Sequence, residues 1–224
     1  MFSQDFKGAI FDLDGTLLDS MWVWQRVDEI FLHARGFAVP DDYSQAILAL
    51  TFRETAEYTI KRFGLCDTPE QLMDEWNQLS EEQYSNHVKL KPGVRGYLKH
   101  LRACGIKLGV ATALTTHVMQ AVLSNNDVLH LFDALTSADE VVRGKTHPDI
   151  YLLAAQKLGI DPRDCIVFED VHKTLRGIRA AGMKACAVWD ESCVEWDKMV
   201  HAFDYHVLSF AQLLTDIANG TRDG

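Results

Sequence analysis

Short runs of mainly apolar residues, several of which end in a polar side chain, recur along this chain and limit the folds open to it. The clear ones are 8–12, 106–112, 165–169 and 184–188, with weaker candidates at 132–136 and 205–208. Near-continuous apolar runs of this length are typical of parallel strands that helices cover on both faces. They therefore predict a buried, mostly parallel sheet.

Segments with helical periodicity lie between these runs in the second part of the chain. Pro92 stands at the expected start of one helix, and Gly105, Gly159 and Gly182 follow the ends of three. The alternation of strand and helix from Pro92 onward indicates βαβ units. We predict an α/β fold with a doubly wound, Rossmann-like parallel sheet.

Residues 18–89 interrupt this alternation. They contain helical patterns near 23–34, 56–63 and 72–79 and no apparent strand run. We expect a small all-α domain, 18–89, inserted after the first strand and folded back over the carboxyl edge of the sheet. The Rossmann-like core domain then consists of residues 1–17 and 90–224.

Composition narrows the range of partners. The 22 basic and 32 acidic residues give a net charge of −10, which disfavours nucleic acid and anionic membranes as partners. A few local cations can still attract one small anionic substrate. Five cysteines without zinc spacing, and an N-terminus (residues 1–7) without signal-peptide features, favour a cytoplasmic protein. We expect it to be a monomer.

Two aspartates stand at the end of the first apolar run and just beyond it. Asp12 and Asp14 are two residues apart on an extended segment and therefore project to the same side. Carboxylates placed in this way repel each other unless a cation lies between them or one is protonated. Gly15 permits a sharp turn after them. An Asx turn that caps the next helix is the alternative interpretation.

Polar residues follow other runs too. Glu169 and Asp170 end one strand, where an acid can also serve as a helix N-cap. The carboxyl ends of parallel strands meet at one edge, so these acids with Asp12 and Asp14 would form an oxygen site suited to Mg²⁺. Thr112 can bind a phosphate oxygen or form an ordinary turn. Lys145 either neutralises the acids or is a solvated surface residue.

These segments together resemble the haloacid dehalogenase superfamily of aspartate-nucleophile phosphotransferases. The similar stretches are 11–17, Thr112, 144–151 and 168–170 with 180–183, so the resemblance covers nearly the whole chain. The chain is most similar to the branch with a small helical cap domain, which contains β-phosphoglucomutase and many sugar-phosphate phosphatases.

The resemblance implies a role for each matching residue. Asp12 would be the nucleophile and become an aspartyl phosphate, and Asp14 would be the general acid and base. Thr112 and Lys145 would hold the phosphoryl oxygens, and Gly15, Thr16 and Ala113 would contact the substrate. The expected Mg²⁺ ligands are Asp12, the backbone carbonyl of Asp14, Asp170 and, directly or through water, Glu169. Arg53 would bind a distal substrate oxygen, or form a surface ion pair with a nearby acid.

One departure from the family pattern bears on the reaction. Trp24 stands where the mutases of this branch carry a cap histidine, and an indole cannot exchange a proton at neutral pH. Hydrolysis is therefore favoured over phosphoryl transfer between sugar hydroxyls. We expect a Mg²⁺-dependent phosphatase for a small sugar or polyol phosphate. A β-phosphoglucomutase-like mutase is the alternative, and a receiver-like phosphate sensor is a third hypothesis.

Overall fold

The computed structural model describes residues 6–48 and 50–220. The chain divides into two compact units, one formed by the residues up to Met21 with those from Val88 onward, and one by Trp22–His87. The first five residues of the N-terminal stretch considered above lie outside the described residues. Among the helices described, none combines the length and the apolar character that crossing a membrane requires.

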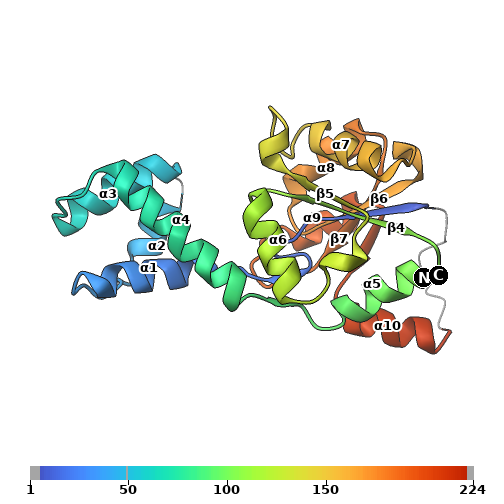
Figure 1. Ribbon diagram of the computed structural model, residues 1–224, viewed down its shortest axis with the longest axis horizontal. Coiled ribbons are helices and arrows are strands. Elements are labelled where there is room, and N and C mark those ends of the chain that lie inside the picture. Colours follow the sequence, from blue (N-terminus) through green and yellow to red (C-terminus); the bar gives the residue numbers. More distant parts are fainter. Residues whose placement is uncertain (1–5, 49, 221–224) are drawn as a thin grey trace. The chain divides into compact units, whose positions relative to one another are not determined.

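The larger unit is built on a six-stranded parallel sheet with strand order β5-β4-β1-β6-β7-β8 (Figure 1). The strands are β1 Gly8–Phe11, β4 Lys107–Thr112, β5 Ala134–Ser137, β6 Cys165–Glu169, β7 Lys184–Val188 and β8 Tyr205–Val207. Each corresponds to one of the six apolar runs, so the predicted doubly wound α/β fold is confirmed. Every residue of β1 and β6, the two central strands, is buried.

Helices cover both faces of this sheet (Figure 1). Helices α7 and α8 lie on one face and α5 and α10 on the other, and α6 and α9 complete the unit. Their bounds are α5 Val94–Ala103, α6 Thr116–Asn125, α7 Asp149–Leu158, α8 Leu175–Ala180, α9 Trp196–Ala202 and α10 Phe210–Ala218. On the α5 and α10 face, Tyr97 packs against Phe168 and Phe210, with ring centroids 6.0 and 5.3 Å away. These contacts fix the two helices on the sheet.

The smaller unit consists of helices. They are α1 Val23–Ala34, α2 Tyr43–Ile47, α3 Phe52–Phe63 and α4 Pro69–Asn86. Thr51 and Thr68 form capping boxes at the starts of α3 and α4, which satisfy otherwise unpaired backbone N–H groups. Trp76 is the centre of the core, because its ring contacts those of Phe31 and Phe52 at 5.4 and 5.6 Å. Helix α2 was not predicted from the sequence.

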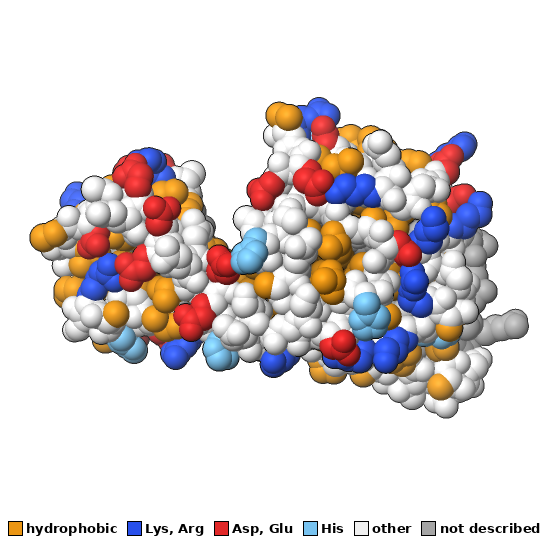
Figure 2. All heavy atoms as spheres, in the orientation of Figure 1, with side chains coloured by type: hydrophobic (Ala, Val, Ile, Leu, Met, Phe, Trp, Pro, Cys, Tyr) orange, Lys and Arg blue, Asp and Glu red, His pale blue; other side chains and the backbone are white. Residues whose placement is uncertain are grey.

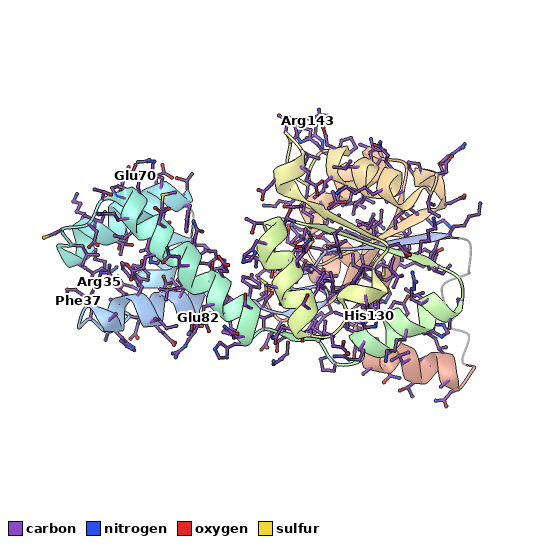
Figure 3. The ribbon with its side chains drawn as sticks, viewed as in Figure 1. Arg35, Phe37, Glu70, Glu82, His130 and Arg143 are labelled. Carbon is purple, nitrogen blue, oxygen red and sulfur yellow. The ribbon has the colours of Figure 1, made fainter. Side chains whose placement is uncertain are left out.

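Ion pairs link the end of α1 with α4 and the residues just before it in this helical unit. Arg35, which follows α1 and is labelled in Figure 3, pairs with Glu75 at 2.7 Å and Asp67 at 3.3 Å. Its guanidinium group also lies 3.8 Å from the centre of the Phe31 ring. Acidic and basic side chains are interspersed on the face of each unit that Figure 2 shows.

Two short strands lie where the helical unit joins the core. β2, Leu18–Asp19, pairs antiparallel with β3, Lys89–Leu90. The sequence analysis expected no strand between residues 18 and 89, and this expectation was wrong at both ends of that range. Two-residue strands show no alternation that a pattern can detect, and long-range contacts stabilise them. Asn126 makes two of these contacts, because its side chain accepts a hydrogen bond from the Leu90 N–H and donates one to the Val88 carbonyl.

Candidate active site

Three acidic side chains meet at the carboxyl edge of the sheet. β1 and β6 are neighbours with Phe11 beside Phe168, so Asp12, which follows β1, lies next to Glu169 and Asp170 at the end of β6. The Asp12 N–H donates to the Phe168 carbonyl at 3.0 Å and holds the two ends together. One carboxylate oxygen from each acid lies within 4.8 Å of the other two, and all three residues are buried.

A buried lysine balances part of this negative charge. The Lys145 ammonium lies 2.8 Å from Asp12 Oδ1 and 2.5 Å from Glu169 Oε1, and its side chain is 13% exposed. Burial alone would lower the pKa of Lys145, but the charges of Asp12 and Glu169 outweigh it and the pKa is raised. Lys145 is therefore a cation within the site. It is not the solvated surface residue that the sequence analysis gave as the alternative.

The charge of the acids exceeds what Lys145 supplies. Burial raises the pKa of both Glu169 and Asp170, and nearby Asp12 raises each further. Glu169 Oε2 is buried and has no hydrogen-bond partner among the described residues. A buried carboxylate oxygen without a partner is costly unless it is protonated or binds a cation. This set of oxygens therefore fits a hard divalent cation.

The turn after Asp12 packs directly on Asp170. Gly15 has a φ of +66°, and a Cβ atom there would lie 2.2 Å from Asp170 Oδ2. The Thr16 hydroxyl donates to Asp170 Oδ1 at 3.2 Å. Asp14, which is partly exposed, accepts a 2.6 Å hydrogen bond from the Ser20 hydroxyl. The structure thus brings Asp12, Gly15, Thr16 and Asp170 into one cluster, and a pocket of about 190 Å³ lies beside Asp170.

Thr112 and Ala113 stand at the same edge of the sheet, because β4 is the neighbour of β1. Thr112 is fully buried, and its hydroxyl oxygen accepts a hydrogen bond from the Leu114 N–H at 3.2 Å. This is the turn considered above as the alternative role for Thr112. Ala113 is exposed. Contact of either residue with a phosphoryl group stays a prediction.

Arg53 lies in the helical unit, in the first turn of α3. Its guanidinium pairs with Glu70 at 2.5 Å, and Glu70, labelled in Figure 3, is in the first turn of α4. The Arg53 side chain is 54% exposed. This contact corresponds to the surface ion pair that the sequence analysis gave as the alternative, and a role in substrate binding stays a prediction.

Three residues that support the cluster were missed by the sequence analysis. Tyr151 donates its hydroxyl hydrogen to Glu169 Oε1 at 3.1 Å, and Ser20 orients Asp14. Lys91 binds the Gly15 carbonyl and Asp190. The Tyr151 and Lys91 contacts join residues far apart in the chain, so no spacing could have revealed them. Ser20 lies six residues after Asp14, and a hydroxyl near a candidate acid is the only local signal.

A doubly wound sheet with buried carboxylates and a lysine at its carboxyl edge defines an α/β enzyme of the type that binds ligands at strand ends. Comparison with known proteins specifies the family. The family model for haloacid dehalogenase-like hydrolases matches residues 9–188. The chain belongs to this family and is a hydrolase.

Individual relatives agree with this assignment. The chain is 30% identical over 213 residues to "Putative phosphatase YhcW" of Bacillus subtilis (strain 168), covering 92% of this chain and 93% of that protein. It is 31% identical over 191 residues to "Hexitol phosphatase B" of Escherichia coli (strain K12), covering 83% and 84%. A crystal structure of a putative β-phosphoglucomutase from Thermotoga maritima has the same fold, with a TM-score of 0.84, 23% identity and coverage of 95% and 99%.

Proposed function

We propose that this protein is a Mg²⁺-dependent phosphatase that hydrolyses a small phosphate monoester, a sugar or polyol phosphate, through an aspartyl phosphate on Asp12. The observation that carries the proposal is the buried Lys145 ammonium between Asp12 and Glu169. An anionic phosphate cannot approach a carboxylate nucleophile unless nearby cations compensate both charges. The relatives named as phosphatases, one of them for hexitols, support the class of substrate.

Hydrolysis would proceed in two displacements. The Asp12 carboxylate attacks phosphorus, and the bond from phosphorus to the ester oxygen breaks as Asp14 gives that oxygen a proton. Asp14 then takes a proton from water, which attacks phosphorus and releases inorganic phosphate and the Asp12 carboxylate. Lys145 and Thr112 bind the phosphoryl oxygens in both steps, and Gly15, Thr16 and Ala113 line their site.

The proposed metal ligands are Asp12, Glu169, Asp170 and the backbone carbonyl of Asp14. Bound Mg²⁺ would offset the charge of the acids and of the phosphoryl group. The support is the unpartnered Glu169 Oε2 together with an oxygen-only donor set.

We further propose that residues 18–89 form the domain that selects the substrate. Trp22, Trp24 and Arg53 are its candidate substrate contacts, and the indole of Trp24 is the reason that hydrolysis is preferred to a mutase reaction. The net charge of −10 supports a protein that acts without nucleic acid or membranes. We propose a cytoplasmic monomer.

The decisive experiment measures phosphate release from sugar phosphates, polyol phosphates, nucleotides and phosphoglycolate, with Mg²⁺ and after chelation. We expect metal-dependent release concentrated on sugar or polyol phosphates. D12N should abolish turnover and keep the fold, whereas D41N, at an exposed aspartate of the helical unit, should be as active as the wild type. Release that persists in D12N would refute the nucleophile assignment. Conversion of β-glucose 1-phosphate to glucose 6-phosphate would instead establish the mutase.

A further inference from the structure

Two buried tyrosines lie on opposite faces of the central sheet and differ in one respect. Tyr151 in α7 is 0% exposed and Tyr97 in α5 is 1% exposed. The Tyr151 hydroxyl donates to Glu169 Oε1 at 3.1 Å. The Tyr97 hydroxyl has no partner among the residues that the structure describes. Only one of these hydroxyls is therefore connected to the acidic cluster.

The two oxygens of Glu169 have unequal surroundings. Oε1 accepts hydrogen bonds from both Lys145, at 2.5 Å, and Tyr151. Oε2 is equally buried and, within the described part of the chain, accepts none. Two donors on one oxygen determine the rotation of the carboxylate group, and they leave the second oxygen as the available ligand atom.

Of these two donors, the tyrosine is the more rigid. Its ring is part of the buried cluster that also contains Ile10, Ala154 and Val167. A packed aromatic ring has few accessible rotamers, whereas the lysine side chain has four rotatable bonds and its ammonium group is shared with Asp12. The position of the Tyr151 hydroxyl therefore depends less on changes at Asp12 than the position of the Lys145 ammonium, which contacts Asp12 directly.

We propose that Tyr151 is a positioning residue that holds Glu169 by Oε1, so that Oε2 alone is presented to the divalent cation as a direct ligand. The proposal rests on the function proposed above, because it requires that a divalent cation binds at the acidic cluster. In this arrangement Tyr151 contacts the metal ligand Glu169, and it contacts neither the cation nor the substrate. Partners of this kind orient metal ligands in many proteins, and their loss costs about 10–100-fold in metal affinity or activity.

The test is a calorimetric titration of the substrate-free protein with Mg²⁺, which reports metal binding without turnover. The Y151F variant loses the hydroxyl and keeps the ring, so its Mg²⁺ dissociation constant should rise about tenfold or more. Its kcat at saturating Mg²⁺ should stay within about threefold of the wild type, because the loss is in metal affinity. Y97F is the matched control, and its dissociation constant should not change.

Two further variants separate this proposal from the metal site itself. D170N should lose Mg²⁺ binding; if it binds as the wild type does, the proposed metal site and the function built on it fail. If D170N loses Mg²⁺ binding and Y151F binds Mg²⁺ as the wild type does, the proposed metal site is supported and the role of Tyr151 is refuted. In an E169Q background, Y151F should cause no additional loss, and an additional tenfold loss would also refute it. Should Y151F fail to fold, Y151M, which also lacks the hydroxyl, is titrated in its place.

Discussion

Replacing Lys91 by methionine tests how the turn at Gly15 is held in place. The three N–H groups of the Lys91 ammonium have three acceptors: Asp190 Oδ2 at 2.7 Å, the Trp189 carbonyl at 3.0 Å and the Gly15 carbonyl. The side chains of Lys91 and Asp190 are only 15% and 10% exposed. K91M keeps an unbranched side chain of similar length and removes the charge and all three hydrogen bonds.

The expected loss follows from these contacts. Removal of one partner of a buried ion pair costs about 3–5 kcal/mol. We expect the low end, about 3 kcal/mol, because Asp190 Oδ1 keeps bonds from the Ser192 N–H and hydroxyl at 2.9 and 2.6 Å. At about 2–4 °C per kcal/mol, the melting temperature of the core unit should fall by about 6–12 °C. Because Gly15 packs on Asp170, kcat should also fall about tenfold or more.

Thermal unfolding and steady-state kinetics check both numbers. K89M, at an exposed lysine two residues earlier, is the control and should change stability by less than about 0.5 kcal/mol. A double-mutant cycle with D190N should give a coupling energy of about 2 kcal/mol. The reasoning is refuted if K91M lies within about 1 kcal/mol of the wild type, or if the K91M and D190N effects simply add.

Three other substitutions give independent tests. G15A places a Cβ atom 2.2 Å from Asp170 Oδ2. It should lower the free energy of unfolding by about 1–3 kcal/mol more than G36A, because Gly36 also has a positive φ but would have no atom within 4 Å of an added Cβ. Equal unfolding free energies of the two variants would contradict the packing of Gly15 on Asp170. S20A removes the 2.6 Å hydrogen bond to Asp14 and should lower kcat about tenfold without changing Mg²⁺ affinity, so an unchanged kcat would show that Asp14 needs no such support. Burial, with a smaller contribution from Glu29, raises the pKa of Asp28 from 3.8 to about 6. The unfolded chain therefore releases this proton at lower pH than the folded protein, and stability is lost as pH rises from about 4 to 6. Relative to the wild type, D28N should gain about 1–2 kcal/mol between pH 4 and pH 8 in urea unfolding, and a pH-independent difference would refute the assignment.

The sheet could be predicted from the sequence because its strands are buried on both faces. Each apolar run, even the weak ones at 132–136 and 205–208, corresponds to a strand. Helix α2 was not predicted because its five residues are too few to show periodicity, and only Tyr43 among them is buried. β2 and β3 were not predicted because their pairing joins residues 70 and 72 positions apart.

The candidate site shows the same division between local and distant signals. Asp12, Asp14, Glu169 and Asp170 stand at or just beyond the ends of predicted strands, so topology alone placed them at one edge of the sheet. Lys145 was less certain, because nothing local shows that a lysine in a loop is buried against Asp12 and Glu169. Tyr151 and Lys91 have hydrogen bonds to segments that lie beside them only after folding. A single sequence contains no trace of such contacts.

The antiparallel pairing of β2 with β3 has a consequence for engineering of the molecule. Asp19 lies opposite Lys89, as at the end of a hairpin whose turn has been replaced by the helical unit. Two strands in this arrangement can be joined by a tight turn of about two residues. We therefore expect that a module could be exchanged between these two strands while the ends of the core chain stay where they are, provided that Ser20, which binds Asp14, is kept. Acquiring a new module of this kind would require no change in the strands that carry the acidic residues.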